Sequence, residues 1–248
     1  NTGFNGSFTI NSGIPETIGG NVNLNYKTKK FNWFTNFGTR YSDREGENSA
    51  FETSYIAGEN NRATTRESNR IRRNYNFRIG KEYYIDNKNT IGLSTGYRYN
   101  NGNNHSTITY ANYDQAMNFL STESRIQSEK EIEHNFDLDL NYKHEFDKPG
   151  HEFVFTGRYS YQTEDEDGQI FTNRVNGLNE EEINREKQNS VVFTADYVRP
   201  IGEKGKFELG ARTDLSDTTT DSKNFIINED GTLTPNERFM ANVDNQQN

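Results

Sequence analysis

The chain of 248 residues carries a formal net charge of −9, has a hydrophobic fraction of 30% and contains no cysteine. The absence of cysteine excludes a disulfide framework and thiolate chemistry, and a pI near 5.1 disfavours nucleic-acid binding. A mean hydropathy of −1.08 approaches that of disordered chains, but 14 Tyr and 17 Phe argue against disorder. No window holds the roughly eighteen apolar residues of a membrane-spanning helix.

Apolar and polar side chains alternate along most of the chain, which is the pattern of strands with one apolar and one polar face. In the longest such segment, Phe136, Leu138 and Leu140 stand at even positions, with acids and amides between them. Crossing a bilayer as a tilted strand takes about nine to eleven residues, so these segments are long enough to span a membrane. The predicted strands are 3–12, 19–27, 31–42, 69–80, 90–100, 131–145, 150–162, 188–199 and 205–217.

The connections between these strands alternate between short and long. Short turns are predicted at 28–30, 84–89, 146–149 and 200–205, and long polar loops at 43–67, 101–130, 163–187 and from 218 onward. In an up-and-down arrangement every short turn then lies on one rim and every long loop on the other, except the brief connection at 13–18. The sequence therefore predicts an all-β fold, an antiparallel up-and-down transmembrane β-barrel with short periplasmic turns and long extracellular loops.

The predicted barrel is an incomplete segment of about nine to ten strands, so residues 1–248 are expected to form a partial outer-membrane barrel domain. We expect the chain to be an internal fragment, or a mature chain trimmed at both ends. Aromatic residues gather near strand ends, as at Tyr26, Trp33 and Tyr142, where rings are typical of the two membrane interfaces. The partners expected from this pattern are outer-membrane lipid and, near outward-facing Arg73, the phosphates of lipopolysaccharide.

Charged residues are expected to line the inside of this barrel. The inward positions hold Arg70, Arg72, Arg78, Arg98 and Arg158 together with Glu133, Asp137 and Asp139. A barrel with a polar interior needs such groups to pair with one another. The alternative is that the arginines hold an anionic ligand or dock a plug domain.

Two stretches of the chain resemble a known family. Residues 138–161, which include the turn Phe146-Asp-Lys-Pro-Gly, and residues 196–212, in which Tyr197-Val-Arg-Pro precedes a Lys-Phe-Glu-Leu-Gly strand, are similar to hairpins of the outer-membrane β-barrel family of TonB-dependent receptors of Bacteroidetes. The segment 87–93 resembles a third recurrent turn, and the likeness covers most of 70–215. The resemblance implies a large transporter barrel in the outer membrane of a Gram-negative bacterium.

The resemblance implies a function in TonB-dependent uptake of a nutrient such as a siderophore, a glycan or a peptide. A contact with TonB would run through an N-terminal region that these residues do not show, since neither a plug domain nor a TonB box is recognisable. One alternative is a small outer-membrane barrel that serves as an anchor or adhesin without transport. Another is a soluble β-sandwich that acts as a binding module, in which the apolar faces would pack on each other.

Candidate ligand-binding residues lie in the predicted loops, because loops on a rigid scaffold commonly carry binding. They are Tyr55, Tyr110, Tyr113 and Phe171. No metal site, cofactor or catalytic residue is predicted: the acidic stretch 163–187 matches no calcium loop, and His144 and His151 are too few ligands for zinc. Hydrolase and nucleotide-binding motifs do not occur in the sequence, so we do not expect an enzyme.

Overall fold

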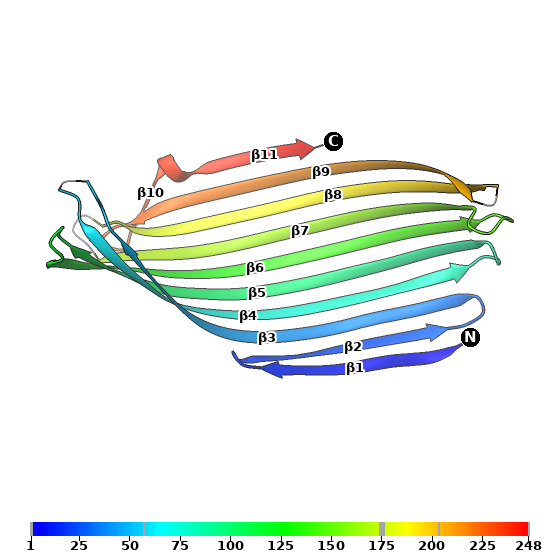
Figure 1. The fold of residues 1–248 in the computed structure, drawn as a ribbon, viewed down its shortest axis with the longest axis horizontal. Coiled ribbons are helices and arrows are strands. Elements are labelled where there is room, and N and C mark those ends of the chain that lie inside the picture. The colour runs from blue at the N-terminus through cyan, green and yellow to red at the C-terminus, as the bar shows by residue number, and fades with distance from the viewer. Residues whose placement is uncertain (1, 57, 174–176, 203, 248) are drawn as a thin grey trace.

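The chain folds into one open antiparallel sheet in the computed structural model, which describes every residue except 1, 57, 174–176, 203 and 248. Strands β1 to β10 lie side by side in chain order, and β11 also pairs with β9 (Figure 1). The elements are β1 (Gly3–Gly13), β2 (Thr17–Lys27), β3 (Phe31–Glu52), β4 (Asn61–Tyr84), β5 (Asn89–Tyr113), β6 (Phe119–Glu145), β7 (Glu152–Asn173), β8 (Asn179–Ile201), β9 (Gly205–Ile227), β10 (Leu233–Pro235), the short 3-10 helix η1 (Glu237–Phe239) and β11 (Ala241–Gln247).

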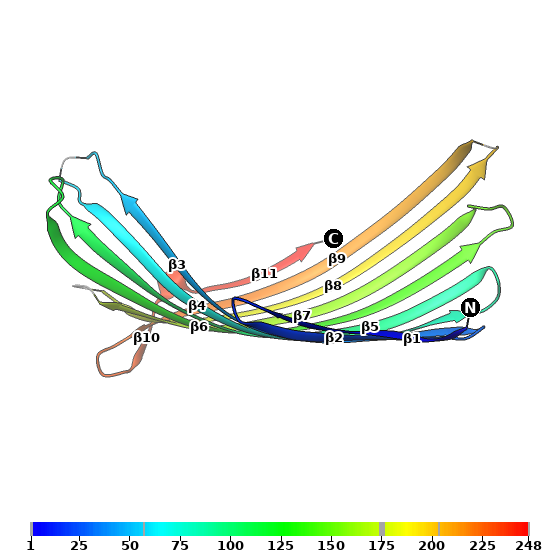
Figure 2. The same cartoon turned by 60° about the horizontal axis from the view of Figure 1, so that its bottom comes forward.

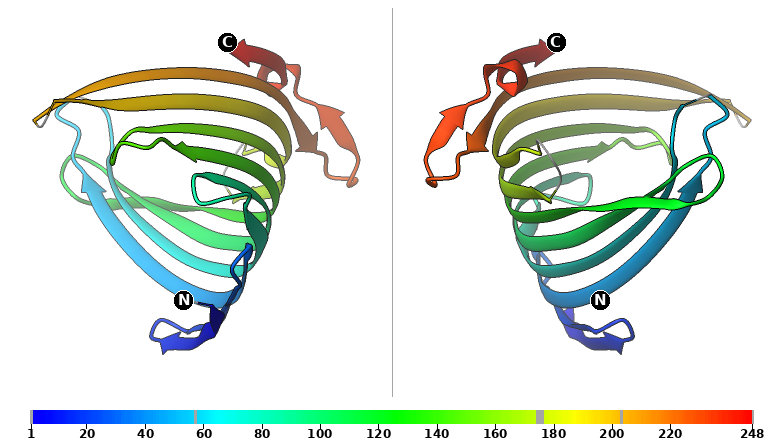
Figure 3. Two further views of the ribbon diagram at one scale, coloured as in Figure 1. Left: turned by 90° about the vertical axis from the view of Figure 1, so that its right-hand side faces the viewer. Right: turned by 90° about the vertical axis from the view of Figure 1, so that its left-hand side faces the viewer.

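The sheet is curved into a trough, with the β1–β2 hairpin at one edge and the C-terminal strands at the other (Figures 2 and 3). Its concave face carries the side chains that were predicted to face inward, and its convex face carries the apolar ones. The predicted up-and-down order of antiparallel strands is confirmed. In the described part of the chain, no helix is long and apolar enough to cross a membrane.

The strands continue well beyond the predicted segments. The stretches 43–67, 101–130 and 163–187 were predicted as loops, but most of their residues extend β3 to β8 as long hairpins. The connections themselves are brief, such as 53–60 between β3 and β4 and 114–118 between β5 and β6. The prediction failed there because these extensions have no apolar face, so apolar and polar residues do not alternate along them. The extensions form through backbone hydrogen bonds between neighbouring strands, which do not depend on that alternation.

The apolar band on the convex face marks the membrane-spanning parts of the strands. From the first apolar residue after each short turn, the convex face carries apolar, aromatic or small side chains as far as a charged, amide or imidazole group, and the last apolar or aromatic residue before that group is the outer limit of the band. Lys81 of β4 is the exception, and its ammonium group lies over the rings of Phe31 and Trp33. The segments defined in this way on β3 to β9 are 31–41, 75–83, 91–99, 136–142, 153–161, 191–197 and 207–215. Most of them have the length of a tilted crossing, about nine to eleven residues.

The register of the strands shows how they tilt relative to this band. Successive pairings align Tyr41, the outer limit of the band on β3, with Asp221 on β9. The outer limit of the band on β9 is Leu215. Leu215 lies six residues closer to the short turns than Asp221, and six strand-to-strand steps separate β3 from β9, so the limit shifts by one residue per strand. One residue of rise, ~3.4 Å, for each ~4.8 Å between strands gives a tilt of roughly 35°, as in transmembrane barrels.

Very little of this molecule is a hydrophobic core. Among the described residues, Ile170 is the single buried hydrophobic side chain, while rings and aliphatic groups of the convex band such as Phe37, Phe77 and Phe193 are 44–49% exposed. A soluble sandwich would need a second sheet packed on this face, but the described strands form one sheet. The apolar face is therefore suited to contact lipid.

The rim with the short turns is held by side-chain hydrogen bonds. The carboxylate of Asp86 accepts bonds from the backbone N–H groups of Lys88 and Asn89 at 2.8 Å. These bonds, first that of Lys88, lower the pKa of Asp86. At the next turn the ring of Phe146 stacks on His151 with centroids 3.9 Å apart, and its edge meets His144 at 4.3 Å. The two histidines thus flank a phenylalanine ring and do not face a shared ligand.

Candidate functional site

At the level of the membrane and just beyond it, the concave face carries the paired charges that the sequence predicted. Asp139 accepts hydrogen bonds from Arg78 and from Arg158, the latter at 2.6 Å. Arg72 reaches Glu131 at 3.0 Å across Gly102, which has no side chain to block the contact. These ion pairs stabilise the wall of the trough.

The remaining predicted lumen residues bond to neutral neighbours. Glu133 accepts a hydrogen bond from the side-chain amide of Asn100 at 2.6 Å, and Asp137 accepts one from the Ser160 hydroxyl at 2.9 Å. Arg70 and Arg98 form no ion pair with another described residue. The predicted network is therefore confirmed for Arg72, Arg78 and Arg158.

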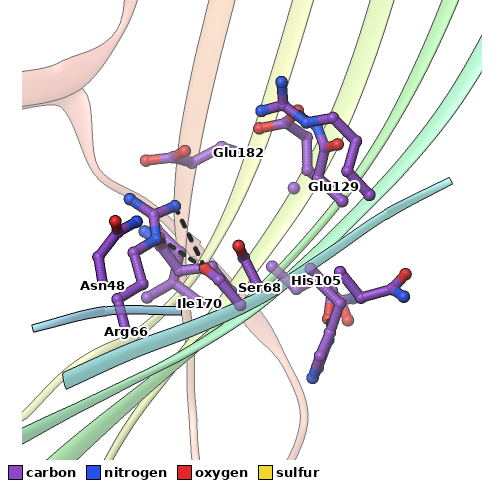
Figure 4. A pocket seen from close by; sticks show the side chains of 15 residues that line it. Asn48, Arg66, Ser68, His105, Glu129, Ile170 and Glu182 are labelled. Atoms are coloured by element: carbon purple, nitrogen blue, oxygen red, sulfur yellow. Dashed lines mark hydrogen bonds between the residues drawn. The ribbon is translucent and has the colours of Figure 1, made fainter. Parts of the chain in front are cut away.

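Beyond the membrane band, the curved strand extensions enclose a cavity of about 320 Å³ on the concave side. Its lining includes Asn48 of β3 and Glu182 of β8, which lie five strands apart in the sheet, because the sheet curls strongly at this end. We call this cavity the vestibule. Figure 4 shows its lining, in which His105 points away from Arg66 and Glu182.

The floor of the vestibule is well ordered by packing and hydrogen bonds. Ser106 and Ile170 are only 5% and 4% exposed. The Arg66 guanidinium donates a bond to the Ser106 hydroxyl at 3.4 Å, and that hydroxyl donates to Gln127 at the same distance (Figure 4). One hydrogen bond thus ties the guanidinium of Arg66 to this floor, while the residue as a whole remains exposed to solvent.

The vestibule is lined by charges of both signs that do not pair with each other. Arg66 and Arg70 stand on β4, and Glu129 and Glu182 stand on β6 and β8. No ion pair joins any of these four residues to another described residue. Glu129 accepts a hydrogen bond from the Asn104 amide at 2.6 Å, which leaves part of its acceptor capacity free.

A second cavity of about 340 Å³ lies farther out on the same face and has the same composition of charges. Two arginines, Arg62 and Arg125, and two glutamates, Glu123 and Glu180, line it. The Arg62 guanidinium lies over the ring of Tyr110 at 5.2 Å from its centroid. The Nε atom of Arg125 is buried and has no hydrogen-bond acceptor among the described residues.

One carboxylate on the concave face has a strongly shifted pKa. Glu164 lies beyond the membrane-spanning segment 153–161 of β7, and its pKa is raised to about 7. Burial is the largest cause, followed by repulsion from Glu166 and from the glutamates of the adjacent strands, which are Glu131, Glu133 and Glu186. This side of the trough is therefore strongly acidic, while the opposite strand β4 carries arginines.

The structure does not bring the four predicted ligand-binding residues together. Tyr55 is 94% exposed in the connection 53–60, and Tyr110 lines the second cavity on the concave face. Tyr113 packs against Phe51 and Phe119 at centroid distances of 6.3 and 6.0 Å. Phe171 pairs with Ile126 at a convex-face position. Three of them lie on strands, so the expectation that they sit in loops was wrong for these three, and of the four only Tyr110 lines either cavity.

Arg70 was predicted to face inward, but the other charged residues of the vestibule were missed for one reason. Arg66, Glu129 and Glu182 lie in stretches that were predicted as loops, so no face could be assigned to them. Successive side chains of a strand point to opposite faces. If β4 and β6 had been continued beyond their apolar segments on this rule, Arg66 and Glu129 would have been placed on the inner face.

The histidines and acids of the described residues do not form a cluster of metal ligands. In the described part of the chain, no group of three or more His, Cys, Asp and Glu side chains is arranged to hold a metal ion. His134 instead contacts the Tyr97 hydroxyl at 2.7 Å, and His151 contacts the Tyr197 hydroxyl at 2.9 Å. The histidines thus take part in side-chain packing at the strand surface.

Comparison with known proteins agrees with the fold. Residues 144–248 match the model of a family described as the outer membrane protein beta-barrel family. No curated protein and no solved structure gives a significant match. The match over residues 144–248, together with the tilted sheet and its apolar convex face, supports an outer-membrane β-barrel fold and a location in the outer membrane of the cell.

Proposed function

We propose that the chain forms part of an outer-membrane receptor or transporter barrel that takes up a nutrient with energy supplied through TonB. The observation that carries this proposal is the polar, cavity-bearing concave face, in which unpaired charges of both signs line the way from the loop side into the trough. An anchor has no need of such a surface. The assignment to TonB rests on the resemblance of the hairpins at 138–161 and 196–212.

The strand directions favour a larger barrel over a small closed one. Nine strands, β1 to β9, reach the level of the membrane, and in an antiparallel series the first and ninth run in the same direction. They cannot close on each other as an antiparallel pair. The described part of β11 pairs with 216–222 of β9, beyond its membrane-spanning segment 207–215. Because unpaired backbone groups in lipid cost several kcal/mol each, these edges require further strands.

A lipid partner is also part of the proposal. The guanidinium of Arg73 lies 5.5 Å from the ring centroid of Tyr41, where the convex apolar band ends on β3 and β4. A charged group at the outer limit of the band is well placed to bind the phosphates of lipopolysaccharide. Contact with TonB would be made elsewhere in the assembled receptor.

Uptake measurements in three strains test this function. Cells that lack the chain, cells that lack TonB and wild-type cells are grown in a defined mixture of peptides, glycans and iron chelates, and depletion of each nutrient is measured. We expect the first two strains to lose uptake of the same nutrient, and re-expression of the chain to restore it. Unchanged uptake in the strain without the chain would support the anchor or adhesin alternative instead.

A further inference from the structure

We infer that the vestibule binds a short peptide with free amino and carboxyl ends, about three residues long. The inference rests on the proposed function and specifies the ligand for it. Its basis is the pair of arginines, Arg66 and Arg70, that shares one cavity with two glutamates, Glu129 and Glu182, without any ion pair between them. Such a cavity offers separate anchors for an anionic and a cationic group.

The contrast with the membrane level of the trough supports this reading. Arg78 pairs with Asp139 at that level, and Arg72 pairs with Glu131 just beyond it. In the vestibule the same strand continues with Arg66 and Arg70, and neither forms an ion pair with another described residue. Their guanidinium groups match a carboxylate in planar, bidentate geometry, and the two glutamates match an ammonium group.

The spacing of the charged groups fixes the length of the ligand. Arg70 pairs with Asn104, and Asn104 with Glu129, so this arginine and this glutamate lie two strands apart in one row of the sheet. Two strand spacings make roughly 10 Å, and an extended peptide advances ~3.3–3.6 Å per residue. Three residues therefore bridge the two anchors. The volume of about 320 Å³ lies in the range of small-molecule sites, roughly 300–1,000 Å³.

The rest of the lining suits a peptide backbone between the two anchors. Asn48, Ser68 and Gln127 offer neutral donors and acceptors around the middle of the cavity, and the Oδ1 atom of Asn104 is buried without a donor among the described residues. Ile170 supplies an apolar patch on the floor. The second cavity, with Arg62 and Arg125 opposite Glu123 and Glu180, repeats the charge pattern on the way in.

Calorimetric titration of the protein, extracted in detergent from the outer membrane, tests the inference. The probes are trialanine, N-acetyl-trialanine, trialanine amide, the doubly blocked peptide and maltotriose. We expect trialanine to bind and each blocked end to weaken binding by roughly tenfold or more, because each block removes a charge-assisted contact. Equal binding of the doubly blocked peptide, binding of maltotriose alone, or no binding of trialanine would overturn the inference.

Variants of the chain assign the two ends. In R66Q/R70Q, we expect trialanine amide to bind as well as trialanine, whereas N-acetyl-trialanine still binds more weakly. In E129Q/E182Q, we expect N-acetyl-trialanine to bind as well as trialanine, whereas trialanine amide still binds more weakly. R40Q, at an arginine of β3 that lines neither cavity, is the matched control and should behave as the unchanged protein. Because the blocked peptides already test the inference on the unchanged protein, a variant that fails to fold does not decide the result.

The two proposals fail in different ways. Trialanine binding without any uptake defect in the strain that lacks the chain would refute the transport function and leave the peptide site standing. Uptake of another nutrient that depends on the chain, together with no trialanine binding, would refute the peptide site and leave transport standing.

Discussion

Individual residues in this molecule act mainly through charge, and their importance depends on whether they are shielded from solvent. Asp139 bonds two arginines while its side chain is only 19% exposed. The surface pair of Arg212 and Asp214 has the same chemistry, but its side chains are 62% and 52% exposed. Hydrogen bonds to shielded charges contribute more to stability than those at an open surface.

The first prediction compares these two acids. Asp139→Asn should lower the free energy of unfolding in detergent by about 1–3 kcal/mol, because Arg78 and Arg158 lose their charged acceptor. Asp214→Asn, the matched control, should change it by less than about 1 kcal/mol. Urea titration followed by circular dichroism measures both. Equal effects of the two substitutions would show that the Asp139 contacts do not stabilise the sheet.

Glu164 gives the second prediction, which concerns pH. Its pKa in the folded protein is about 7, above the ordinary value of 4.5, so the folded state holds a proton that the unfolded chain has already released between those two values. Stability should therefore fall as pH rises from about 4.5 to 7 and level off above. Glu164→Gln should remove this part of the pH dependence.

The urea midpoint at a series of pH values provides the measurement for Glu164. The control is Glu180→Gln, a glutamate on the same concave face. Two results would contradict a raised pKa of Glu164. The pH profile could be the same in Glu164→Gln as in the unchanged protein, or the Glu164 carboxyl could make stability rise between pH 4.5 and 7.

At the scale of the elements, the two halves of each long strand differ in their sequence pattern. Within the membrane band apolar and polar side chains alternate at most positions, so the sequence alone located segments such as 31–42 and 150–162 and the faces they present. Beyond the band both faces meet water, and the pattern that reveals a strand disappears. The extensions are stabilised by backbone pairing with neighbours that are distant in sequence, which no local pattern can show.

The candidate site was hard to predict for the same physical reason. Its charged residues come from β4, β6 and β8, and they meet only because the strand extensions pair in register and the sheet curls. The sequence did predict the ion pairs of the trough wall, since Arg72 and Arg78 lie in the predicted strand 69–80, where the alternation fixes the inner face. It could not predict that Arg66 and Arg70 remain without a partner.

A third prediction tests the two faces of β6. Leu138 lies within the apolar band on the convex face, and Asn141, in the same strand, points to the concave side. Leu138→Arg should destabilise the folded protein in lipid bilayers by roughly 2–4 kcal/mol. Asn141→Arg should cost much less, because it places the guanidinium in the polar trough. Reversal of this order in urea unfolding from lipid vesicles would mean that the faces are assigned the wrong way round.

For the whole molecule, the open trough accounts for the unusual composition. A sheet one layer thick buries almost no apolar side chain, so a chain with a hydrophobic fraction of 30% can still present a continuous apolar band to lipid. The polar remainder forms the inner wall and the strand extensions. The sequence predicted this distribution because strand periodicity, and not mean hydropathy, decides which face is apolar.

The most direct test of the account is a cysteine scan along β6 from Asn135 to Asn141 in lipid vesicles, with a spin label attached at each position. The native chain has no cysteine, so every label is unique. The account predicts that oxygen, which dissolves in lipid, relaxes the labels at 136, 138 and 140 most strongly, and that a water-soluble nickel reagent relaxes those at 135, 137, 139 and 141. Accessibility that does not alternate, or that alternates with the opposite phase, would contradict a sheet that presents its convex face to the outer membrane.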